Sequence, residues 1–64
     1  MFQIKNGKLF ADINNEIVEV DVEETVRLLG RGLQNIAVKD RDYPKIEDYS
    51  DFKELEEILK KDFS

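Results

Sequence analysis

The chain has 64 residues, with 10 Lys and Arg against 15 Asp and Glu, so its formal net charge is -5. It contains no Cys, and its longest apolar runs, such as Ile36-Ala37-Val38, are three residues long. These features exclude disulfides, a membrane-spanning segment and the apolar core of a signal peptide, and they predict a single compact domain, 1–64, in the cytoplasm.

Two short turn sequences organise residues 1–22. Asn6-Gly7 and Asn14-Asn15 both favour two-residue turns of type I′, which join antiparallel strands. When both turns are built, alternate residues of three strands fall on one face. The sequence therefore predicts a three-stranded meander whose apolar face comprises Phe2, Ile4, Leu9, Ala11, Ile13, Val18, Val20 and Val22.

A short helix is predicted over 23–29. Asp21 followed by Glu24 is typical of a helix N-terminus, because an aspartate side chain caps the first amides. Gly30 and Gly32 then provide two positions at which the chain can adopt positive φ and leave the helix.

The segment 34–39 is predicted to form a fourth strand, since the β-branched residues Ile36 and Val38 flank Ala37. Following a crossover helix, this strand is expected to run parallel to the first strand and beside its vacant edge. The predicted fold is therefore α+β with element order β-β-β-α-β-α and a four-stranded mixed sheet of order 3-2-1-4.

The remainder is predicted to be a loop over 40–49, which contains Pro44, and a helix over 51–63 capped by Ser50. Apolar residues recur at helical spacing along that helix. This predicted stripe comprises Phe52, Leu55, Ile58, Leu59 and Phe63.

Enzymatic activity is not expected, because the chain has neither His nor Cys and therefore lacks an imidazole base, a thiolate nucleophile and the usual zinc ligands. No cofactor is expected. The loop spacing of Asp40, Asp42, Asp48 and Asp51 matches four positions of a calcium-binding loop. Since Lys45 occupies the position of the turn glycine, a solvated loop is the preferred interpretation and no metal site is predicted.

Two apolar residues are predicted on the polar face of the sheet. Phe10 and Ile17 lie on adjacent strands and are diagonal neighbours in the derived register. They are either ordinary exposed apolar residues, a surface buried by a helix, or a contact surface for a partner or a second copy. Tyr43 and Tyr49 bracket the Pro loop and extend the candidate contact surface, because tyrosine is common at interfaces.

Acidic residues are concentrated near the third strand and the first helix. They either keep a small protein soluble or imitate the phosphates of a nucleic acid. The set comprises Glu16, Glu19, Asp21, Glu23 and Glu24.

These patterns predict a small non-enzymatic interaction or regulatory protein that acts through contacts with a protein partner, with a homodimer as one form. The alternative is an acidic, nucleic-acid-mimicking inhibitor of a nucleic-acid-processing protein, of viral or mobile-element type. Direct binding to nucleic acid and binding to a membrane are not expected.

Overall fold

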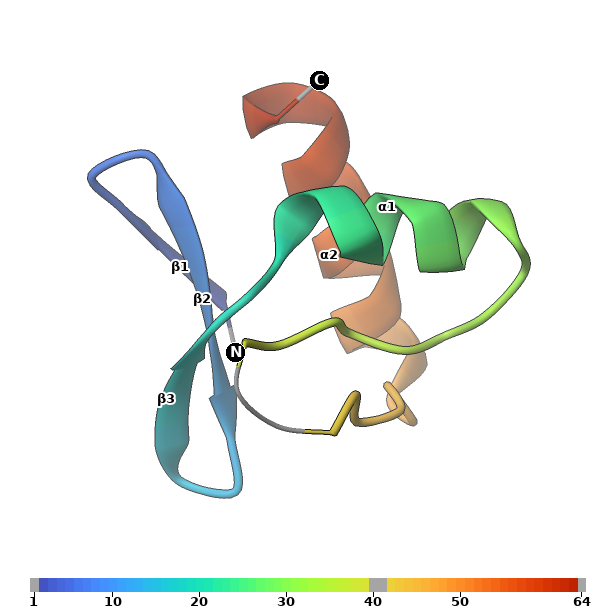
Figure 1. Ribbon diagram of the computed structural model, residues 1–64, viewed down its shortest axis with the longest axis horizontal. Coiled ribbons are helices and arrows are strands. Elements are labelled where there is room, and N and C mark those ends of the chain that lie inside the picture. The colour runs from blue at the N-terminus through green and yellow to red at the C-terminus, as the bar shows by residue number, and fades with distance from the viewer. Residues whose placement is uncertain (1, 40–41, 64) are drawn as a thin grey trace.

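The three strands of the sheet form a meander (Figure 1). In the computed structural model, which describes residues 2–39 and 42–63, the elements are β1 (Phe2–Lys5), β2 (Lys8–Ile13), β3 (Glu16–Glu19), α1 (Val22–Gly30) and α2 (Tyr49–Asp62). The class is α+β, as the sequence predicts. The element order is β-β-β-α-α, however, and the sheet is three-stranded and antiparallel with order β1-β2-β3.

The register of the meander is the predicted one. Phe2 pairs with Ala11 across β1 and β2, and Ala11 pairs with Val18 across β2 and β3. Both turns have positive φ at their two central residues, which type I′ requires. These φ values are 52° and 76° for Asn6-Gly7, and 53° and 65° for Asn14-Asn15. Asparagine tolerates this left-handed conformation better than most residues.

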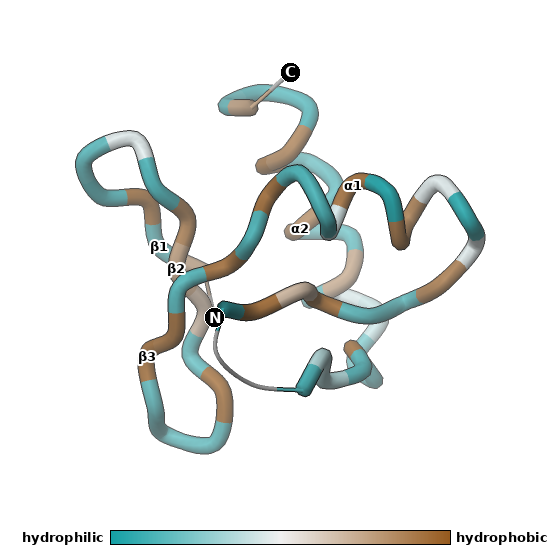
Figure 2. The backbone as a smooth tube through the Cα atoms, in the orientation of Figure 1, coloured by the Kyte–Doolittle hydropathy of each residue, from teal (hydrophilic) through white to brown (hydrophobic). Residues whose placement is uncertain are grey.

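One face of the sheet builds the core. Apolar and polar residues alternate along β1, whereas β2 and β3 each carry one further apolar residue, Phe10 and Ile17, among the polar positions (Figure 2). The exception on the apolar face is Ile4, which remains 44% exposed near the first turn. The buried core cluster combines the meander with residues from the segment 34–39, called the return segment below, from the loop that follows it and from α2: Leu9, Ala11, Val18, Val20, Ile36, Val38, Ile46, Leu55 and Leu59.

Helix α1 has a defined cap at each end. The Asp21 side chain accepts a hydrogen bond from the Glu24 N–H at 3.1 Å. At the other end, Gly32 has a φ of 83° and donates to the Leu29 carbonyl at 3.0 Å. Leu33 N–H donates to the Leu28 carbonyl, also at 3.0 Å, which completes a Schellman motif. The last helical residue is therefore Gly30, and Gly32 is the residue that adopts positive φ and terminates the helix.

The predicted fourth strand over 34–39 is wrong. This segment forms two isolated bridges, Val20 with Val38 and Asn35 with Lys45, both antiparallel. It lies against the end of β3, where the Asp21 N–H donates to the Ala37 carbonyl at 2.7 Å, and not beside β1. The predicted parallel pairing and the order 3-2-1-4 are therefore also wrong.

The direction of α1 explains this difference. The helix continues away from the end of β3, so the chain after Gly32 returns beneath it toward β3 (Figure 1). Ile36, Ala37 and Val38 are buried in succession. In a half-exposed strand, by contrast, successive residues alternate between buried and exposed. Its other side is bonded to the following loop, with the Ile46 N–H donating to the Gln34 carbonyl at 2.7 Å.

Helix α2 begins two residues before the predicted 51–63. Its N-cap is Asp48 rather than Ser50, because the Asp48 carboxylate accepts hydrogen bonds from the N–H groups of Ser50 and Asp51 at 2.8 and 3.4 Å. The helix packs on its own chain through the buried residues Leu55 and Leu59. The sheet, the return segment and the two helices thus enclose one core.

Candidate interaction surface

The outer face of the sheet is the principal candidate surface. Both helices lie on the opposite side of the sheet (Figure 1). The alternative that a helix covers the outer face is therefore not realised in the part of the chain that the structure describes. The register assigns this face the residues Gln3, Lys5, Lys8, Phe10, Asp12, Ile17 and Glu19.

Phe10 and Ile17 provide the apolar part of this face. Phe10 lies opposite Glu19, and Ile17 lies opposite Asp12, so the two apolar residues are diagonal neighbours on adjacent strands. Ile17 is 52% exposed, whereas Phe10 is half-buried. The sheet therefore brings these two predicted contact residues together on an uncovered face.

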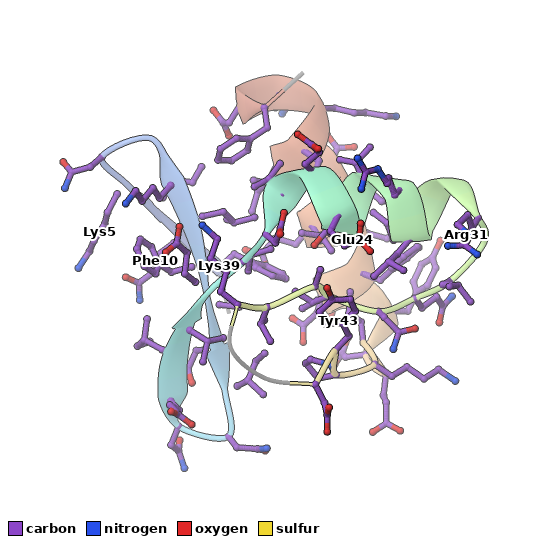
Figure 3. All side chains as sticks on the ribbon, in the orientation of Figure 1. Lys5, Phe10, Glu24, Arg31, Lys39 and Tyr43 are labelled. Carbon is purple, nitrogen blue, oxygen red and sulfur yellow. The ribbon has the colours of Figure 1, made fainter. Side chains whose placement is uncertain are left out.

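Glu19 and Lys39 form the boundary of the outer face at the β3 edge. Their side chains form an ion pair at 3.1 Å, and the Lys39 N–H also donates to the Glu19 carbonyl at 3.2 Å. These two contacts fix the end of the return segment to β3. Figure 3 shows Lys39 and Phe10 in this part of the molecule.

Two lysines form a basic corner at the first turn. Lys5 and Lys8 are direct cross-strand neighbours, and both are exposed. Within residues 2–39 and 42–63, neither lysine has an ion-pair partner. Like charges in this relation are unfavourable in the isolated sheet, by a few tenths of a kcal/mol where solvent screens them.

The structure does not join the two predicted tyrosines to the outer face. Tyr43 lies beneath α1, near the middle of the view, whereas Phe10 lies on the sheet at the left (Figure 3). Its carbonyl accepts a hydrogen bond from the Asn35 side chain at 3.1 Å. Tyr49, the first residue of α2, is 70% exposed, and the Lys53 Nζ atom lies 5.9 Å from its ring centroid.

The pKa of Lys53 is raised. The main cause is a hydrogen bond to Glu56, and the interaction with Tyr49 acts in the same direction. The ammonium form is therefore favoured beside the Tyr49 ring, where it can form a cation–π contact. Lys53 thus gives Tyr49 a contact within its own helix.

The predicted acidic surface is engaged by its own chain. Arg27 contacts Glu23 and Glu24 at 3.1 and 3.0 Å, and Asp21 is the cap of α1. Glu19 is paired with Lys39, and Glu16 also has an interaction within the chain. The paired carboxylates stay partly exposed, from 29% for Glu19 to 82% for Glu23, and surface ion pairs of this kind are weak. Each nevertheless has a role in the folded chain.

A hollow between α1 and α2 was not expected from the sequence. It has a volume of about 300 Å³ and is lined by Val26, Leu29, Glu56, Leu59, Lys60 and Phe63. Val26 is 49% exposed there. The only signal in the sequence is the helical spacing of Val22, Val26 and Leu29, because the hollow itself depends on how the two helices cross.

Among the described residues, the acidic side chains with calcium-like spacing are not brought together in a group. Asp48 is the cap of α2, and hydrogen bonds from Ser50, first from its hydroxyl and then from its backbone, lower the pKa of the Asp48 carboxyl. Asp40 lies outside the described residues. In the remaining, described part of the chain, no group of three potential metal-ligating side chains is assembled. No helix among the described residues is long and apolar enough to cross a bilayer.

Comparisons with protein-family models, with curated proteins and with solved structures found no match to this chain.

Proposed function

We propose that this chain is a small non-enzymatic interaction module that binds a protein partner through the outer face of its sheet, around Phe10 and Ile17. The observation that carries this proposal is the uncovered position of that face, since both helices pack on the other side (Figure 1). An exposed Ile17 beside a half-buried Phe10, with polar residues around them, is a feature of contact surfaces. Association through this face would also bury apolar area that a chain of 64 residues leaves in water.

The same observations give less support to an acidic inhibitor that imitates nucleic acid. Such an inhibitor needs a continuous row of available carboxylates. Here Arg27 lies against Glu23 and Glu24, and Lys39 lies against Glu19. Positive side chains are thus interspersed with the carboxylates that would have to act together.

Partner capture with matched baits tests the proposal. The wild-type chain, Phe10→Glu and Tyr49→Glu are each used as bait in a lysate of the source cells. A protein that is retained by the wild type and by Tyr49→Glu, but lost with Phe10→Glu, would support the outer face as the binding surface. Equal retention by all three baits would contradict it.

Self-association through the same face is tested by light scattering over a concentration series at low and high salt. An apolar contact is expected to persist as salt rises, because screening acts on charges. A dimer that persists in salt and dissociates on Ile17→Lys would identify the partner as a second copy. A dimer that Ile17→Lys leaves intact would place self-association elsewhere.

A further inference from the structure

The outer edge of β1 is open in the described chain. The Val20 N–H donates to the Leu9 carbonyl at 2.9 Å, so the backbone of Leu9 faces β3. Because backbone groups of successive strand residues point in opposite directions, Lys8 and Phe10 face β1 and bond to their partners there. The N–H and C=O groups of the alternate residues, Phe2 and Ile4, therefore point away from the sheet, toward the vacant edge.

The opposite edge of the sheet is different. The Glu19 carbonyl accepts from Lys39, and Val20 forms a bridge with Val38. The return segment thus covers much of the β3 edge. Across residues 2–39 and 42–63, β2 is the sole strand neighbour of β1. An edge strand with unpaired backbone groups is a template for one more strand.

The side chains beside this edge define what kind of strand it accepts. Lys5 and Lys8 stand on the outer face at one end of β1, without ion-pair partners among the described residues. On the inner face, Ile4 is 44% exposed next to the same edge. An incoming strand therefore meets positive charge on one face and an apolar side chain on the other.

The same lysines disfavour a second copy as the occupant. β1 carries no carboxylate, so pairing it with β1 of another chain would bring no negative charge to Lys5, and a parallel arrangement would place the two copies of Lys5 side by side. A strand that carries carboxylates on that face is favoured by the same charges. The charge of the edge thus selects for acidic partners.

We propose that the open edge of β1 binds an extended acidic peptide segment of a partner protein, in which acidic and apolar residues alternate. Its backbone pairs with the N–H and C=O groups of Phe2 and Ile4. Its carboxylates lie near Lys5 and Lys8, and its apolar side chains meet Ile4. This inference rests on the proposed function, because it names the chemistry of the partner that the sheet recognises.

The test uses the full chain labelled with ¹⁵N and a short end-blocked peptide of alternating Val and Glu. Chemical-shift changes are expected over Phe2–Lys5, with slower hydrogen exchange at the amides of Phe2 and Ile4. The peptide of alternating Val and Lys is the matched control and is expected not to bind. Equal binding of the two peptides, or an absence of shift changes over Phe2–Lys5, would overturn the proposal.

Two variants test the contribution of the charges beside the edge. Lys5→Glu combined with Lys8→Glu is expected to weaken peptide binding by about tenfold or more, since it turns attraction into repulsion. Lys61→Glu on α2 changes the net charge away from the sheet and is expected to have a much smaller effect. Equal weakening by both would mean that overall charge, and not this edge, attracts the peptide, and would overturn the proposal.

Ile4→Pro removes an edge N–H that has no partner in the pairing of β1 with β2, and it is expected to abolish peptide binding while the circular dichroism spectrum is retained. If this variant unfolds, the binding result with Lys5→Glu combined with Lys8→Glu decides whether the proposal stands. Binding of a short oligothymidylate in place of the peptide, or dimerisation that protects the Phe2 and Ile4 amides, would overturn the proposal. These readouts are independent of the partner-capture result with Phe10→Glu, so either proposal can fail alone.

Discussion

The hydroxyl oxygen of Thr25 accepts a hydrogen bond from the backbone N–H of Ala37 at 3.0 Å, and both residues are completely buried. This bond joins α1 to the return segment beneath it. Thr25 is the one polar residue among the fully buried residues described. Its position is explained by the amide that it satisfies, because a buried N–H without a partner is unfavourable.

Thr25→Val keeps the volume of the side chain and removes the acceptor of the Ala37 N–H. Its free energy of unfolding is expected to fall by about 1–3 kcal/mol, measured by urea denaturation. Thr25→Ser keeps the oxygen and removes one methyl group, so a smaller loss of about 0.8 kcal/mol is expected. A Val variant as stable as the wild type would mean that the bond contributes nothing to stability.

The second turn tests the backbone geometry of the meander. Asn15 has a φ of 65°, which a β-branched residue adopts only with strain. Asn15→Val is expected to lower the melting temperature, with a loss of about 1–2 kcal/mol. Asn15→Gly is the matched variant and is expected to equal or exceed the wild type, since Asn-Gly is a favoured pair in such turns. A Val variant that melts with the wild type would contradict the assigned turn.

The capping carboxylate of Asp48 is expected to make the stability of α2 depend on pH. Its pKa is lowered in the folded chain, first by the Ser50 hydroxyl and then by the backbone N–H groups of Ser50 and Asp51. A lowered folded pKa means that the stabilisation is complete above the unfolded value of about 3.9 and is lost as pH falls through the folded value.

Asp48→Asn keeps a capping acceptor but does not titrate. The stability difference between the wild type and Asp48→Asn, followed by circular dichroism from pH 6 to pH 2, is therefore expected to shrink as the solution becomes acidic. A difference that stays constant over this range would show that the charge of Asp48 does not stabilise the helix cap.

Leu55 tests whether α2 is integral to the core. Its side chain has no exposed surface, and Leu55→Ala is expected to lower the free energy of unfolding by about 2–5 kcal/mol. The matched control is Leu33→Ala, because Leu33 is 44% exposed and a loss below about 1 kcal/mol is expected. Similar losses in the two variants, measured by urea denaturation, would contradict the packing of α2 on the sheet.

The meander could be predicted from the sequence because its information is local. Asn6-Gly7 and Asn14-Asn15 each specify a two-residue turn, and the period-two pattern then permits one register. The outer-face position of Phe10 and Ile17 follows directly from that register. This part of the candidate surface was therefore also within reach of sequence reasoning.

The position of the 34–39 segment could not be predicted in the same way. Ile36 and Val38 favour extended backbone, and the segment is extended enough to form bridges, but the choice of neighbour depends on the direction in which α1 leaves β3. The segment is then held by contacts between residues distant in the sequence, such as Thr25 with Ala37. The separation of Tyr43 from Phe10 has the same origin, because the loop follows the return segment.

The difference between these two parts has a consequence for the order of folding. The two hairpins connect residues that are close in the sequence, so their loops close rapidly, whereas the bridge between Val20 and Val38 requires the whole helix to be in place or a long loop to be closed. We expect the meander to form early and the return segment to dock late. Substitutions at Asn15 are then expected to change the folding rate, and those at Thr25 mainly the unfolding rate.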